Sequence, residues 1–151
     1  MTDEAGFKAQ TVEAIRKLAP NALAIRHEDK VTTGIPDLSL SYAGITTWWE
    51  FKVIRVGDGP EPFSPRVQVV TALRLDRAGS LCRYIAWRLD ADDKPSEAVV
   101  LDPRDVWIHL VEGRSLSIES SLSPEPSAVA TAIVELHLSA KRKINVKIMT
   151  A

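Results

Sequence analysis

Alternation of apolar and polar residues in the first half of the chain predicts a helix followed by three strands. Residues 7–19 place apolar side chains near one face and charged ones on another, as an amphipathic helix does. A short strand is expected over 22–26. Residues 37–43 then alternate strictly, and 46–54 form an apolar strand. Because the connection at Gly44 is short, we expect these last two strands to form an antiparallel hairpin.

The second half of the chain carries clear helix-start signals. Ser64-Pro65 and Asp102-Pro103 each combine a capping side chain with a proline suited to the first helical position, and a glycine closes each predicted helix. This order of elements predicts an α/β fold with a mixed sheet flanked by helices. The expected elements are a helix over 65–78, strands over 81–88 and 98–101, a helix over 103–111, a connector over 121–127, a helix over 128–140 and a last strand over 144–149.

Length and composition favour a single soluble domain spanning residues 1–151. The only cysteine, Cys82, excludes an internal disulfide and a multi-cysteine zinc site. No apolar run reaches the roughly 20 residues of a membrane helix, and the N-terminus lacks a secretion signal, so we expect no membrane partner and a cytoplasmic protein. The net charge of -1 does not indicate nucleic-acid binding, although residues 52–90 and 129–151 each carry a net charge of +3.

Two charged residues interrupt the most apolar predicted strand. In the strand TTWWEFKVI, Glu50 and Lys52 lie on one face. Trp49, Phe51 and Val53 lie on the other. Charges are expensive to bury unless they are paired or bind a metal. The tripeptide alone is more typical of a salt bridge on an edge strand.

The position of Asp37 strengthens the functional interpretation. Asp37 opens the preceding strand of the hairpin, which is expected to bring its carboxylate near that of Glu50. Two close carboxylates repel each other, and a divalent cation such as Mg²⁺ relieves the repulsion. The Lys52 ammonium would then orient an attacking water and stabilise charge developing on a phosphate. This set of residues is suited to phosphodiester hydrolysis.

Three motifs together resemble the PD-(D/E)XK nuclease superfamily. They are Gly34-Ile35-Pro36-Asp37, Glu50-Phe51-Lys52 and Ser64-Pro65-Arg66-Val67-Gln68. The similarity covers residues 4–88 and is greatest to the VRR-NUC group, which is common in phages and related to Holliday-junction resolvases. It implies a restriction-endonuclease-like core over 1–101, followed by a C-terminal α/β extension over 102–151 that matches nothing in the family.

The resemblance also implies roles for individual residues. Asp37 and Glu50 would bind Mg²⁺ or Mn²⁺, with the backbone carbonyl of Phe51 completing the metal site. Lys52 would serve the attacking water, and Gln68 would lie beside the active site, although a surface helix glutamine is the alternative. Phe51 departs from the family, in which this position usually holds a small or branched aliphatic residue.

Family members often add a glutamate from the first helix. Glu13 is the candidate here and Glu4 the second choice, although an i,i+4 pair with Lys17 explains Glu13 equally well.

The implied protein is a Mg²⁺-dependent deoxyribonuclease acting on DNA, with branched or structured DNA as one candidate substrate. A homodimer would suit a junction-cutting enzyme, and the cytoplasm would be that of the bacterial host if a phage encodes the protein. The alternative is a non-catalytic nucleic-acid-binding or phage-assembly module that keeps the nuclease fold. The sequence does not distinguish DNA structures or pathways.

Overall fold

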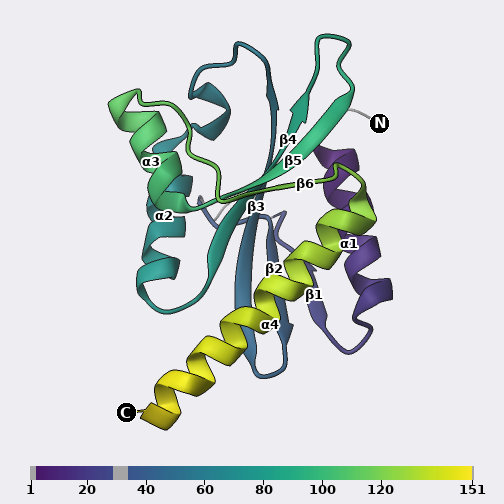
Figure 1. Ribbon diagram of the computed structural model, residues 1–151, viewed down its shortest axis with the longest axis vertical. Coiled ribbons are helices and arrows are strands. Elements are labelled where there is room, and N and C mark those ends of the chain that lie inside the picture. Colours follow the sequence, from purple (N-terminus) through teal and green to yellow (C-terminus); the bar gives the residue numbers. More distant parts are fainter. Residues whose placement is uncertain (1–2, 29–33, 151) are drawn as a thin grey trace.

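A computed structural model describes residues 3–28 and 34–150 of the chain (Figure 1). Six strands form one sheet, and helices cover both of its faces. The elements in chain order are α1 (Glu4–Leu18), β1 (Leu23–Arg26), β2 (Leu38–Tyr42), β3 (Ile45–Arg55), the short 3-10 helix η1 (Glu61–Phe63), α2 (Arg66–Arg77), β4 (Cys82–Leu89), β5 (Pro95–Leu101), α3 (Pro103–Glu112), β6 (Ser120–Leu122) and α4 (Pro126–Thr150).

The strands lie side by side in the order of the sequence, β1-β2-β3-β4-β5-β6. Strands β3 and β4 pair in parallel and are joined by a connection that contains α2. The other neighbouring strands of the described chain pair antiparallel. The predicted α/β class and mixed sheet are therefore confirmed, and the hairpin expected between the second and third strands is present.

Each face of the sheet has its own hydrophobic core. Helices α1 and α4 cover one face, where Trp49 and Phe51 of β3 point, and α2 and α3 lie on the opposite side (Figure 1). Strand alternation therefore turns Glu50 and Lys52 toward the α2 face. The first core includes Phe7, Ile15, Trp87, Val129 and Ile133, and the second includes Phe63, Val69, Tyr84, Val99 and Val106.

Two predictions for the C-terminal third were wrong. Residues 144–149, predicted as a strand, are the end of α4, which continues unbroken to Thr150. Their backbone is helical rather than extended, and Ile148 and Met149 are exposed. Strand β6 lies at the start of the segment predicted as a connector and pairs with β5. No helix in the described part of the chain is long and apolar enough to cross a membrane.

The two predicted helix starts differ in outcome. Asp102 caps α3 as expected, because its Oδ1 accepts a hydrogen bond from the amide of Arg104 at 2.9 Å. Ser64 does not cap α2: the residue before the first turn is Pro65, and no side chain caps that end. Pro65 itself has an extended backbone, with φ -80° and ψ 159°. Helix α2 therefore begins one residue later than predicted.

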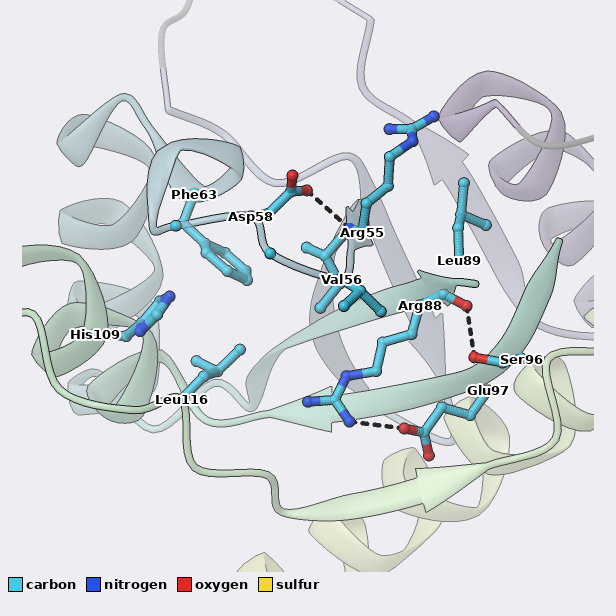
Figure 2. A pocket seen from close by; sticks show the side chains of 13 residues that line it. Arg55, Val56, Asp58, Phe63, Arg88, Leu89, Ser96, Glu97, His109 and Leu116 are labelled. Atoms are coloured by element: carbon cyan, nitrogen blue, oxygen red, sulfur yellow. Dashed lines mark hydrogen bonds and ion pairs between the residues drawn. The ribbon is translucent and has the colours of Figure 1, made fainter. Parts of the chain in front are cut away.

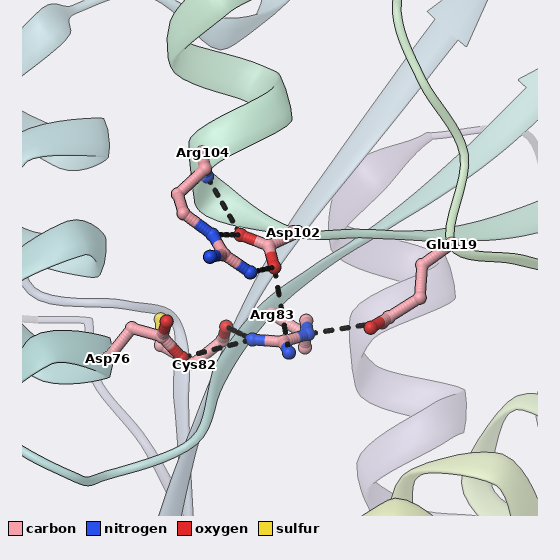
Figure 3. A network of polar contacts seen from close by, with 6 residues as sticks. All are labelled: Asp76, Cys82, Arg83, Asp102, Arg104 and Glu119. Carbon is pink, nitrogen blue, oxygen red and sulfur yellow. Dashed lines mark hydrogen bonds and ion pairs between the residues drawn. The ribbon is translucent and has the colours of Figure 1, made fainter.

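A partly buried arginine joins the α2 and α3 layer to the sheet (Figure 3). The Arg83 side chain on β4 is 13% exposed and lies 3.1 Å from Asp76 of α2 and 3.0 Å from Glu119, which precedes β6. It also lies 3.7 Å from Asp102, the cap of α3. One guanidinium thus contacts three separate segments, which fixes the layer that carries Gln68.

His137 fixes α4 to the hairpin and is fully buried. Its Nε2 donates to the carbonyl of Tyr42 at 2.7 Å, which leaves Nδ1 to accept from the Thr47 hydroxyl at 2.7 Å. Thr47 in turn accepts from the Trp49 indole N–H at 2.9 Å. Burial lowers the pKa of His137, so the neutral ring is the folded form.

We predict that this histidine makes the protein less stable in mild acid. The unfolded chain takes up a proton near the ordinary pKa of 6.5, whereas the folded imidazole resists it. The stabilisation is therefore complete above that pKa and is lost as the pH falls below it. In urea unfolding between about pH 7.5 and 5, the advantage of wild type over His137→Gln should shrink on acidification.

Thr131→Ala is the control, because this exposed residue of α4 does not titrate and its replacement should leave the pH profile unchanged. A wild-type advantage that stays constant across the range would contradict the assignment.

Candidate active site

The hairpin register places Asp37 opposite Glu50. The last pair of β2 and β3 is Leu38 with Trp49, so the next position outward pairs Asp37 with Glu50. Residues directly opposite on antiparallel strands point to the same face of the sheet. The two carboxylates do meet, because their side chains share a hydrogen bond.

Asp37 is held as a carboxylate by three neighbours. The Phe51 amide donates to its Oδ2 at 2.9 Å, and the Lys8 ammonium of α1 lies 3.0 Å from its Oδ1. Burial alone would raise the pKa of Asp37, but the hydrogen bonds from Glu50 and Phe51 and the charge of Lys8 outweigh it and lower that pKa.

Glu50 has the opposite tendency. Its side chain is only 3% exposed. Burial, together with the hydrogen bond and negative charge of Asp37, raises the pKa of Glu50 to about 10, and Lys52 only partly opposes this. At neutral pH one proton therefore lies between the two carboxyl groups, and it is carried by Glu50. A cation placed there would have to displace that proton.

Lys52 follows Glu50 on the same face and is 8% exposed. Its Nζ donates to Oε1 of Gln68, in the first turn of α2, at 3.0 Å. The structure thus brings together the four residues predicted as catalytic. The contact gives the Lys52 ammonium a fixed direction, and it shows why a glutamine rather than an apolar residue occupies this inward position of α2.

The first helix contributes different residues from the one preferred in the sequence analysis. Glu13 is not at the site: its side chain is 70% exposed and pairs with Lys17 at 3.6 Å. Glu4 lies nine residues earlier, about 13 Å along the helix. Glu4 is half-buried, and this burial raises its pKa. The charges of Lys52 and Asp37 also act on that pKa, Lys52 lowering it and Asp37 raising it. The second choice, Glu4, therefore lies beside the site.

Lys8 is the site residue that sequence reasoning missed. It lies four residues after Glu4 and so shares its face of α1. That spacing was the available signal. That spacing is not sufficient, because the local sequence pattern does not show which face of α1 is turned toward the site.

Gly34, three residues before Asp37, packs against α2. Its φ is +93°, and a Cβ built on it would lie 2.8 Å from Thr71 Oγ1 and 3.0 Å from the carbonyl oxygen of Val67. The loop backbone therefore packs directly on the helix that carries Gln68. A residue with any side chain would push these two parts of the site away from each other.

The residues suit a hard divalent cation. Among the described residues, no three His, Cys, Asp or Glu side chains gather closely enough to form a ready-made metal cage. Mg²⁺ needs less, because it usually takes one or two carboxylates and fills its other positions with waters and substrate phosphate. Asp37 and Glu50 meet that requirement. The role of the Phe51 carbonyl and the choice between Mg²⁺ and Mn²⁺ stay predictions.

Comparison with known proteins adds no assignment. No protein-family model matches the chain, and no curated protein matches it at a significant level. Any function must therefore be argued from the chain's own side chains and their geometry.

We predict that Gly34→Ala destabilises the protein more than Gly79→Ala does. Both glycines have a φ of +93°, but the space around Gly79 is open. Both variants should lose about 1–3 kcal/mol from backbone strain, and Gly34→Ala should lose more through its clash with α2. Chemical denaturation measures the difference. Equal losses would show that the contact with α2 does not constrain Gly34.

We also predict that Glu50→Gln stabilises the protein in the absence of divalent cations. Folded Glu50 stays protonated up to about pH 10, whereas in the unfolded chain it ionises above its ordinary pKa of 4.5. Wild-type stability should therefore fall as the pH rises between these values. Gln is neutral and can donate to Asp37, so Glu50→Gln should be about 1–2 kcal/mol more stable at pH 8.

Thermal and urea unfolding at several pH values, in EDTA, test this. Glu13→Gln is the control, because Glu13 is exposed and its replacement should change stability little at any pH. A Glu50→Gln variant less stable than wild type at pH 8 would show that the carboxyl is ionised in the folded protein.

Proposed function

We propose that this protein is a divalent-metal-dependent deoxyribonuclease with a restriction-endonuclease-like core. The observation that carries the proposal is the contact between the partly exposed Asp37 and the buried Glu50, with Lys52 on the same face. Ionisable groups whose pKa values are shifted in opposite directions by burial and by each other cluster at functional sites, so their presence in the middle of a sheet calls for a functional explanation. A structural salt bridge on an edge strand does not fit, because β3 lies inside the sheet.

Each residue has a separate task in phosphodiester hydrolysis. A divalent cation, when bound, supplies Lewis-acid activation of the attacking water and neutralises phosphate charge. Asp37 and Glu50 hold it through hard carboxylate oxygens. Lys52, directed by Gln68, stabilises the negative charge that develops on the phosphate. Glu4 adds a carboxyl group from α1 near these residues.

The order of elements supports the nuclease interpretation. The sequence motifs imply a helix, a hairpin with both acidic residues, a helix with the glutamine and a further strand. In the structure α1, β2, β3, α2 and β4 follow that order. The C-terminal region adds β6 to the sheet edge, and α4 packs with α1 in one core. It therefore completes the fold that holds the site.

Aromatic and basic residues near the site favour nucleic acid as the substrate. Trp48 lies on the same face of β3 as Glu50, remains partly exposed and stacks on His27 with ring centroids 5.5 Å apart. Exposed aromatic rings can stack on bases. The basic side chains that do lie in the site are Lys52 and Lys8.

One contact favours a second candidate, a non-catalytic nucleic-acid-binding module. The ion pair between Lys8 and Asp37 satisfies the Asp37 carboxylate within the chain. A protein that had lost cleavage could use such a pair in place of a metal. Metal binding at Asp37 and Glu50 distinguishes the two functions.

The decisive experiment is cleavage of a supercoiled plasmid and of a synthetic four-way junction in Mg²⁺, Mn²⁺ or EDTA. We expect metal-dependent cutting by wild type, reduced at least about 100-fold in Asp37→Asn and in Lys52→Ala. Glu4→Gln should lower activity, whereas Glu13→Gln on the same helix should not, because Glu13 is remote from the site.

Calorimetric titration with Mn²⁺ gives an independent readout. Binding by wild type that is lost in Asp37→Asn would support the site. If the protein neither cuts DNA nor binds Mn²⁺, the nuclease function is rejected and the binding module is favoured.

A further inference from the structure

A cavity of about 430 Å³ lies where β3 ends (Figure 2). Its walls come from five elements, β3, β4, β5, η1 and α3, and from the loops that follow them. Ile54 and Arg88 line it from β3 and β4, Phe63 from η1, and His109 from α3, with Leu116 from the segment after α3. Figure 2 shows the side chains of Phe63, Arg88, His109 and Leu116 arranged around a common hollow.

The cavity lies on the same sheet face as the candidate active site. Along β3 this face carries Glu50, Lys52 and Ile54, and Ile54 pairs in register with Arg88 of β4. Two strand residues span about 7 Å, so the cavity begins within one nucleotide's reach of Lys52.

A buried tyrosine lies between Glu50 and one wall of the cavity. Tyr84 pairs in register with Glu50, and its ring contacts Phe63 edge-on with centroids 5.8 Å apart. Tyr84 does not itself line the cavity. The Phe63 wall therefore packs against a residue that neighbours the candidate active site.

The lining suits a flat aromatic ligand with polar edges. Phe63 and His109 meet at 85° with centroids 5.9 Å apart, and Leu116 adds an apolar surface. Arg88 and Glu97 form an ion pair at 2.7 Å, which offers both hydrogen-bond donors and acceptors. Since Glu97 neutralises Arg88, the pair is poorly suited to bind a phosphate and well suited to the edge of a base.

We propose that this cavity binds the unpaired base of the nucleotide next to the phosphate held at Asp37, Glu50 and Lys52. The proposal rests on the nuclease function and names its substrate class. A base in a duplex is stacked on its neighbours and cannot enter a walled pocket. The enzyme would therefore act on DNA with an unpaired nucleotide at the cut, as in single strands, flaps or junctions.

The test is an NMR titration of the full-length ¹⁵N-labelled protein in EDTA. The probes are dAMP and, as the matched ligand without a base, 2-deoxyribose 5-phosphate. We expect dAMP to shift the amides of residues 54–59 and 88–97 in a saturable manner, and the sugar phosphate to leave them unchanged. Because cleavage is blocked in EDTA, the readout does not depend on nuclease activity.

Two tryptophan substitutions in one segment provide the matched variants. Leu116→Trp should fill the cavity and weaken dAMP binding at least about tenfold, the scale of one lost base contact. Ile118→Trp is the control, because Ile118 is 38% exposed and does not line the cavity. Circular dichroism checks that both variants fold.

The outcomes separate this proposal from the nuclease function. Shifts confined to residues 37–52, equal for dAMP and the sugar phosphate, would overturn the base pocket and leave the nuclease untouched. Equal affinity of wild type and folded Leu116→Trp would also overturn it. Binding of dAMP in the cavity by a protein that cuts no DNA would support the pocket and reject only the nuclease.

Discussion

Burial of two ionisable side chains, Glu50 and Lys52, on the central strand is the constraint on which the rest of this structure depends. Strand β3 must satisfy two faces at once: Trp49 and Phe51 build the α1 and α4 core, and Glu50 and Lys52 take the opposite face. Unpaired charges in such a position would destabilise the fold by several kcal/mol each. The neighbouring elements must therefore supply partners, and each partner comes from a different element, with Asp37 at the start of β2.

Helices on both faces of the sheet supply these partners, Lys8 from α1 and Gln68 from α2, and so form part of the site. Lys8 reaches Asp37 only because α1 packs against α4, which His137 in turn fastens to the hairpin. Gln68 reaches Lys52 because α2 is held at both ends, by the close approach of Gly34 near its start and by Arg83 near its end. Contacts far from the carboxylates thus set their geometry, which is the support that a preorganised site requires.

The sequence predicts the parts of this arrangement that depend on short-range rules. A short hairpin fixes its own register, so the meeting of Asp37 and Glu50 follows from strand alternation. The rotation of α1 follows no local rule, because it is set by packing against α4 more than a hundred residues away, and this is why Glu13 was preferred over Glu4. Strand alternation likewise misread residues 144–149, where a sheet partner, not the pattern, decides between strand and helix.

The parallel pairing of β3 and β4 explains why a site and a cavity occur next to each other. Parallel strands bring their carboxyl ends to the same edge, and the connections that leave them must spread apart there. The chain leaves β3 through η1 and leaves β4 through the turn into β5, and the hollow lies between them. The row of side chains that carries Glu50 and Lys52 therefore continues, at Ile54, into the space left by these connections. One structural feature, the parallel step in an otherwise antiparallel sheet, thus places the candidate active site and the cavity about 7 Å apart along β3.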